Sequence, residues 1–389
     1  MRILAENPID GVWEMLSQWE SIELAKKLVS ARADKHNVQM DAVKLDKKAQ
    51  ALAYCIRNAR ENIRTVSPAL TTAATLNYYG CMWLAAAVAV SQPSNDADLE
   101  KLESTTTNGH GLGNIVSKSE NFPNNEFVYV KSGGFFIQYL RWMGYGDQSR
   151  TNYILSPAKR PKTVEDLSEN EKTKLISVID LFGRIPEIVQ LFENVTDGFA
   201  LNFQVFYESS TNHQENTQDM YSTVYKSEAD IKPFSRNRGY TWLGLQNALK
   251  YPLDHLRKYG PPMEEFEIRN LVTDRCWTGK FSHSPGESWG QGPAFYKSAL
   301  SPTSWVAPIF GDLSDPLAIH LMLLYQLSIF SRYRPAIWRE VIEGNFDQYK
   351  ILITAYFRAF TRVIPEFALN RILDEHLNVA MPGSLFAPL

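Results

Sequence analysis

The sequence predicts a mainly α-helical protein, in which the N-terminal and C-terminal segments form a helical bundle around a small β-containing insertion. Apolar residues recur at helical spacing in long stretches near both ends of the chain, which is typical of packed helices. The stretch from Phe199 to Tyr207, FALNFQVFY, instead alternates in the manner of a strand. We therefore expect three parts: an N-terminal helical part at 1–125, a mixed part with short strands, helices and irregular loops at 126–313, and a helical part at 314–389 that packs on the N-terminal helices.

Three helices are predicted in the first part. One is expected within residues 8–37, and a second from Leu45 to Val66, where one apolar stripe stands among arginines and glutamates on the other faces. A third is expected from Ala69 to Val90, because its many small residues suit close packing between helices. Ser67-Pro68 separates the second helix from the third, since a residue before proline disfavours helical geometry.

A polar, glycine-rich loop surrounds His110 in the sequence TTTNGHGLGN. Its glycines and asparagines predict unusual backbone angles. The loop has neither the GK[ST] ending of a P-loop nor the GxGxxG spacing of a dinucleotide site. Phosphate binding through its backbone N–H groups is therefore only an unspecific expectation.

The middle of the chain gives weaker signals. Phe127–Val130 and Gly134–Gln138 predict a small hairpin around a glycine pair. Tyr240–Tyr259 carries leucines at helical spacing and predicts a helix. Residues 260–313 are rich in Gly, Pro, Ser and Trp without a long period, so we expect an irregular connection there.

The C-terminal part is built around a long apolar helix. Pro316 suits its first position, where a missing N–H costs nothing. Leu317–Phe330 is apolar on most of its circumference, which predicts a helix buried on nearly all sides. Pro335 ends the run, and two further helices are expected at Tyr349–Val363 and Glu366–Leu377.

The apolar run approaches the roughly 20 residues that cross a bilayer. His320 and Gln326 interrupt it, however, and Asp315 and Arg332 bound it closely. We therefore expect a buried helix of a soluble protein and no membrane association.

The composition favours the cytoplasm and no cofactor. The formal net charge of −3 gives no global field that attracts nucleic acid. The 3 cysteines show neither a CxxC pair nor metal-ligand spacing, so no metal site is predicted. The first residues, MRILAENPIDGVWEML, have no apolar signal-peptide region, which favours a cytoplasmic location.

Three segments together resemble the YaaC-like family of bacterial proteins. They are SPALTTAATLNYYGCMWLAAAVAV, NGHGL close behind it, and LLYQLSIFSRYRPAIW much later in the chain. The resemblance implies a mainly helical cytoplasmic protein and says little about mechanism.

The helical ends also resemble the HEPN superfamily, which includes RNA-cleaving toxins, antiviral effectors and inactive binding modules. Its active motif, an Arg followed by four to six residues and a His, is matched by Arg371 and His376 in the last predicted helix. The resemblance implies that this His would act as general acid or base on an RNA 2′-hydroxyl, while the Arg stabilises phosphate charge without a metal. The alternative is a solvated helix end with basic residues near its negative pole.

A second candidate site consists of His110, Arg332 and Arg334, which could close over a phosphate-bearing ligand. Guanidinium groups fork onto phosphate or carboxylate, and histidine titrates near neutral pH. The alternatives are a hydrogen bond that fixes the loop at His110 and internal ion pairs at the two arginines.

The leading hypothesis from the sequence is a cytoplasmic, nucleic-acid-linked component of a bacterial defence or stress system, with RNA as substrate if Arg371 and His376 are catalytic. One alternative is a non-catalytic subunit that binds a partner protein or a second copy of itself. Another is a sensor of a phosphate-bearing small ligand at His110, Arg332 and Arg334.

Overall fold

The computed structural model describes residues 2–65, 69–145, 153–156, 161–207, 239–270, 275–284, 295–375 and 377–380. The chain divides into two compact units. The helical unit consists of Met1–Phe182 and Pro316–Leu389, and the sheet unit consists of Gly183–Asp315. The three-part division expected from the sequence stays a prediction. The chain is mainly α-helical, as predicted.

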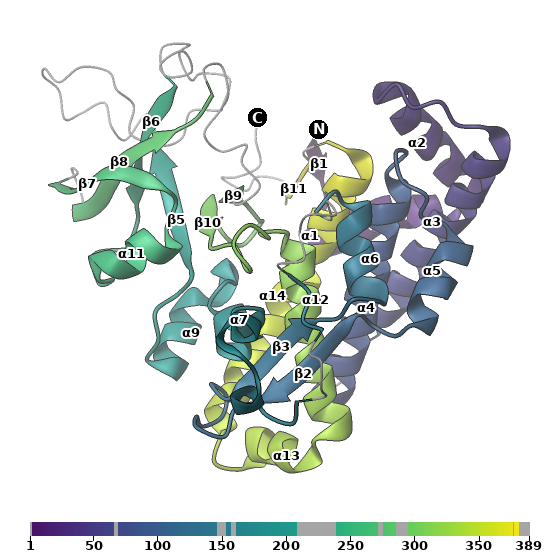
Figure 1. The fold of residues 1–389 in the computed structure, drawn as a ribbon. Coiled ribbons are helices and arrows are strands. Elements are labelled where there is room, and N and C mark those ends of the chain that lie inside the picture. Colours follow the sequence, from purple (N-terminus) through teal and green to yellow (C-terminus); the bar gives the residue numbers. More distant parts are fainter. Residues whose placement is uncertain are drawn as a thin grey trace, which may run out of the picture. The chain divides into compact units, whose positions relative to one another are not determined.

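The N-terminal helices of the helical unit are α1 (Pro8–Ser17), α2 (Ile22–Lys35), α3 (Ala42–Ile63) and α4 (Leu70–Ser91) (Figure 1). Side-chain oxygens cap the first three, as at α3, where Asp41 accepts a hydrogen bond from the backbone N–H of Lys44 at 2.7 Å. The helices predicted at 45–66 and 69–90 are therefore confirmed within a few residues.

Helix α4 is the central helix of this unit. It packs against α3, against α12 (Pro316–Tyr333) and against α14 (Asp347–Leu373) (Figure 1). Five of its six alanines are fully buried, and a side-chain carbon at Gly80 would overlap Ile63 of α3. Small residues thus let the neighbouring helices approach closely.

Among the described residues, one helix is long and apolar enough to cross a membrane. This helix is α4, with a mean hydropathy of 1.3. In that helix, 72% of the apolar window is buried inside the protein. The sequence directed attention to α12 instead. Burial of this kind is typical of a core helix in a soluble protein.

The C-terminal helices are α12, α13 (Pro335–Glu343) and α14. The prediction of two helices separated at Pro365 is wrong, because α14 continues through that proline. Proline removes one backbone donor from a helix. Its neighbours Val363, Ile364 and Ala368 are buried, and this packing holds the helix on both sides of it.

A three-stranded antiparallel sheet belongs to the helical unit. Its order is β2 (Leu112–Val116), β3 (Glu126–Val130) and β4 (Leu175–Ser177), with Ile115 opposite Phe127. The predicted hairpin at 127–138 is wrong, since the second run belongs to helix α6 (Phe135–Trp142). Six of the eight α6 residues are buried. Burial on more than one side of this segment favours a helix over the predicted strand.

The sheet unit contains a six-stranded sheet of order β7-β8-β6-β5-β10-β9. The strand expected within 199–207 is confirmed as β5. The strands are β5 (Asn202–Tyr207), β6 (Tyr240–Leu245), β7 (Met263–Asn270), β8 (Arg275–Ser282), β9 (Phe295–Tyr296) and β10 (Ser304–Val306).

Two predictions for this region are wrong. Tyr240–Leu245 is a strand, and only α11 (Leu253–Tyr259) is helical in the run predicted as one helix. The described part of residues 260–313 contains four strands rather than an irregular connection. β7 pairs with its neighbour β8 and β9 with its neighbour β10, whereas β8 also pairs with β6 and β10 with β5, which lie further away in the sequence.

The remaining elements complete the two units. β1 pairs in parallel with β11, with Arg2 opposite Asn378. These elements are β1 (Arg2–Leu4), α5 (Leu99–Thr107), α7 (Glu169–Lys172), α8 (Val178–Phe182), α9 (Val189–Thr196) and β11 (Asn378–Ala380).

Candidate functional site

The loop before β2 fixes the position of His110. Gly109 and Gly111 on either side adopt φ angles of +86° and +77°, so the expectation of unusual backbone angles is confirmed. The carbonyls of Gly109 and His110 accept hydrogen bonds from the backbone N–H groups of Phe135 and Phe136, both at 3.0 Å. The loop carbonyls therefore cap the first turn of α6, while the His110 side chain remains available for contacts with other elements.

Three tyrosine rings surround the His110 imidazole. The ring centroids of Tyr78, Tyr79 and Tyr325 lie 5.2, 6.1 and 6.3 Å from that of His110. Tyr78 and Tyr79 come from α4, and Tyr325 comes from α12. Tyr78 and Tyr325 are buried, while His110 is half-buried. The imidazole has no hydrogen-bond partner among the residues that the structure describes.

Arg332 completes this group, and we call Tyr78, Tyr79, His110, Tyr325 and Arg332 the tyrosine–histidine–arginine cluster. The centre of the Arg332 guanidinium lies 5.9 Å from the Tyr79 ring centroid. Tyr79 is therefore a neighbour of both Arg332 and His110. Its Nε and Nη2 atoms donate to the carbonyl and hydroxyl of Ser328, each at 3.1 Å.

The Arg332 guanidinium also lies 5.0 Å from the ring centroid of the exposed Tyr333. In the described part of the chain, no carboxylate lies within ion-pair distance of this half-buried arginine. The same is true of Lys131, an exposed residue directly after β3. Stacking on aromatic rings and hydrogen bonds to serine stabilise the Arg332 charge without neutralising it.

The electrostatics of the cluster favour a neutral histidine. Burial lowers the pKa of His110, and the positive charges of Arg332 and Lys131 lower this pKa further. Burial likewise raises the pKa of Tyr325 to about 12 and the pKa of Tyr78 well above its usual range. Near neutral pH the cluster therefore contains uncharged rings beside one permanent cation.

Arg334, the third residue of this predicted site, lies in a different environment. Its Nη1 atom forms an ion pair with Oε2 of Glu126 at 2.5 Å, and the Glu126 side chain is fully buried, with 0% exposure. Gln326 Nε2 is 3.4 Å from the same carboxylate oxygen. The alternative from the sequence, an internal ion pair, thus describes Arg334, whereas His110 and Arg332 are brought together.

Burial raises the pKa of Glu126, and the Arg334 hydrogen bond opposes this shift. The Oε1 atom of Glu126 and the Oε1 atom of Gln326 are buried without a hydrogen-bond partner among the described residues. The Arg334–Glu126 ion pair joins β3 to the end of α12, next to Arg332.

Arg371 lies in the last turn of α14, with its guanidinium 4.9 Å from the ring centroid of Phe367. Its carbonyl accepts a hydrogen bond from Nη1 of the buried Arg32 at 2.9 Å. The helix ends at Leu373, and Asp374 follows in a left-handed conformation with φ 55°. The last helix therefore ends four residues before Leu377, its predicted end, and His376 itself lies outside the described residues.

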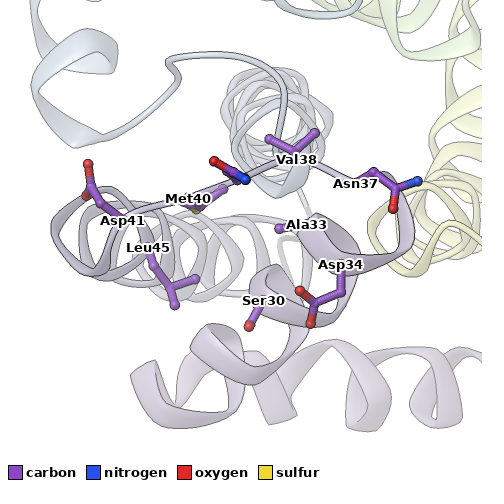
Figure 2. Close-up of a pocket in the computed structure, with 9 residues that line it drawn as sticks. Ser30, Ala33, Asp34, Asn37, Val38, Met40, Asp41 and Leu45 are labelled. Atoms are coloured by element: carbon purple, nitrogen blue, oxygen red, sulfur yellow. The ribbon is translucent and has the colours of Figure 1, made fainter.

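A surface pocket of about 780 Å³ lies between the end of α2 and the start of α3. Figure 2 shows its polar side chains, among them Asp34 from α2 and Asp41 from the start of α3. Asp41 is the N-cap of α3, and no member of the tyrosine–histidine–arginine cluster lines this pocket. We therefore place no site there.

The sequence did not single out the three tyrosines, although a signal was present. Tyr78 and Tyr79 stand in the first of the three segments that carry the family resemblance, His110 in the second, and Tyr325 with Arg332 in the third. Segments far apart along the chain thus meet at one cluster. Within the described residues, no group of three His, Cys, Asp or Glu side chains could hold a metal ion.

Comparisons with known proteins address the family. No curated protein matches the chain, and no solved structure matches it. A model of the YaaC-like protein family matches residues 17–372, which is nearly the whole chain. The protein therefore belongs to the YaaC-like family.

Proposed function

We propose that this YaaC-like protein binds a phosphate-bearing small ligand at the tyrosine–histidine–arginine cluster and acts as a sensor of that ligand in the bacterial cytoplasm. One observation carries the proposal. Arg332 is a half-buried cation that has aromatic neighbours and no carboxylate partner among the described residues. A partly desolvated arginine in such a setting gains more from a phosphate than a solvated or already paired one does.

The surroundings of Arg332 suit such a ligand. The half-buried Tyr79 ring offers flat apolar contact, His110 offers a ring nitrogen for a hydrogen bond, and Lys131 adds a second positive charge nearby. Arg334 is excluded from direct contact in this proposal because Glu126 already holds it. The cluster would therefore recognise one phosphate group with an attached planar or apolar group.

A thermal-shift series with inorganic phosphate and nucleotides tests this function. A ligand at 100 times its dissociation constant is expected to stabilise the protein by about 2.7 kcal/mol. In Arg332→Gln the affinity should fall roughly 10- to 100-fold, because a charge-assisted hydrogen bond contributes about 1.5–3 kcal/mol.

Arg358→Gln is the matched control. Arg358 is an exposed arginine of α14 in the same unit, and its loss should leave the shift unchanged. Absence of a shift with every phosphate compound, or an equal shift in Arg332→Gln, would contradict the proposed site.

The second candidate function is metal-independent RNA cleavage by Arg371 and His376 within a defence or stress system. It is favoured by the spacing of the two residues and by the fixed position of the α14 end, where Arg32 binds the carbonyls of Arg371 and Ile372 at 2.9 and 2.8 Å. A fixed backbone at this end suits a residue that must stabilise phosphate charge.

Incubation of the purified protein with total RNA in the presence of a metal chelator tests this candidate. Cleavage should occur and should fall at least about 100-fold in His376→Ala, as expected for the loss of a general acid or base. The control is His283→Ala, which changes a histidine directly after β8 in the sheet unit. Cleavage that survives His376→Ala would contradict the role of His376. Intact RNA would favour the alternative of a non-catalytic subunit that binds a partner protein or a second copy.

A further inference from the structure

We infer that the tyrosine–histidine–arginine cluster selects a phosphate monoester over a phosphate diester, and that His110 takes up a proton when the monoester binds. This inference rests on the proposed function and specifies its ligand class. Three elements of the helical unit supply the basic groups: His110 comes from the loop before β2, Lys131 follows β3, and Arg332 lies in α12.

Every charged group that acts on His110 in the described part of the chain is positive. Arg332 and Lys131 act on it from two different elements, and no carboxylate acts on it. The side chains that pack around its ring are the tyrosines of α4 and α12, which are neutral near pH 7. In the free protein a proton on His110 would therefore add a third positive charge to a partly buried site, which is unfavourable.

A monoester and a diester change this balance differently. A phosphate monoester carries between about −1.5 and −2 charges at pH 7 because its second pKa is about 6. A diester carries a single negative charge and offsets only Arg332. The second charge of the monoester offsets Lys131 as well, which removes the repulsion at His110. The neutral imidazole then accepts one proton from solvent, and the resulting imidazolium donates a hydrogen bond to a phosphate oxygen.

The geometry supports contact of one phosphate with both groups. His110 and Arg332 share Tyr79 as a ring neighbour, at centroid distances of 6.1 and 5.9 Å. The imidazole has no hydrogen-bond partner among the described residues, and Ser328 is the only described hydrogen-bond partner of the Arg332 guanidinium. Both groups thus have donors to offer to an anion.

Calorimetric titrations with phenyl phosphate and methyl phenyl phosphate test the inference. The two compounds share a ring and differ in whether the phosphate is a monoester or a diester. At pH 7.5 the monoester is expected to bind at least about 10-fold more tightly, which corresponds to one charge-assisted hydrogen bond. Its binding heat should differ between a phosphate-free buffer of high and one of low ionisation enthalpy, which reports proton uptake.

His110→Asn should retain weak binding of phenyl phosphate but lose the buffer dependence of the binding heat. The control His36→Gln should keep the wild-type affinity and the wild-type buffer dependence. Equal affinities for the two esters with buffer-independent heats would overturn the inference and leave the proposed function intact. If neither ester nor inorganic phosphate binds the wild-type protein, the proposed function fails and the inference falls with it.

Discussion

Arg334→Met is expected to lower the free energy of unfolding of the helical unit by about 3 kcal/mol at pH 7.5, which is the lower end of the range for breaking a buried ion pair. The Glu126 carboxyl is fully buried, and Arg334 is its one cationic partner among the described residues. Without that partner the carboxylate keeps only the long contact with Gln326 Nε2. Urea unfolding followed by helical circular dichroism would measure the loss.

The loss in Arg334→Met should shrink as the pH falls. Burial already raises the pKa of Glu126, and removal of Arg334 takes away the hydrogen bond that opposes this shift. A carboxyl whose pKa is raised by folding binds a proton more readily in the folded state than in the unfolded state. The folded protein is therefore favoured below the unfolded pKa, and this advantage is lost as the pH rises through the folded pKa of Glu126.

The double variant Glu126→Leu, Arg334→Met is the matched control. Because it removes both charges, we expect it to be more stable than Arg334→Met at pH 7.5 and to show no pH dependence from Glu126. Equal stability of Arg334→Met and the wild-type protein at pH 7.5 would show that the ion pair contributes nothing.

Arg32→Met is expected to have a similarly large effect at the opposite end of the helical unit, of about 3 kcal/mol. Arg32 is only 3% exposed and joins three helices through its guanidinium. It donates to Ser91 Oγ at 2.7 Å and to Gln92 Oε1 at 3.0 Å at the end of α4. It also donates to the carbonyls of Arg371 and Ile372 in the last turn of α14.

Methionine at this position would leave these acceptors without the donor that Arg32 supplies, and unpaired buried polar groups lower the free energy of unfolding. Hydrogen exchange should show faster exchange in the last turn of α14, in addition to a lower unfolding midpoint. Arg57→Met, an exposed arginine on α3, should change neither quantity. Unchanged exchange in Arg32→Met would contradict its role as the residue that holds the α14 end.

The helices were largely predictable because their signals are local. The alanine-rich run of α4 and the apolar run of α12 each contain enough information within one element to predict a buried helix. What the sequence did not reveal is which of them is central. That depends on how closely other helices approach α4, and Gly80 against Ile63 is a contact between two elements.

The sheet unit was harder to predict for a physical reason. A strand is stabilised by its partner strand, and β10 pairs with β5, whose residues lie about a hundred positions earlier, as in Trp305 opposite Phe203. The region 260–313 has no internal period that would reveal such a partner. The helical spacing of leucines in Tyr240–Tyr259 correctly predicted a helix only in its last part, α11.

The candidate site was predictable in part. Glycines next to His110 correctly indicated an unusual loop, whereas Arg332, which was expected directly after the buried helix, lies in its last turn. The separation of Arg332 from Arg334 was beyond the sequence, because Glu126 stands 208 positions before Arg334. Neither local pattern nor spacing identifies which of two neighbouring arginines meets a distant buried carboxylate.

The hydrogen bonds between the His110 loop and α6 couple the proposed ligand site to a helix. The backbone carbonyls at Gly109 and His110 are the acceptors for Phe135 and Phe136, so the loop and the first turn of α6 are one mechanical element. A ligand that displaced the His110 backbone would have to break these two bonds or carry the helix end with it. Occupancy of the cluster would then be transmitted as a movement of α6, whose aromatic residues are buried in the same unit.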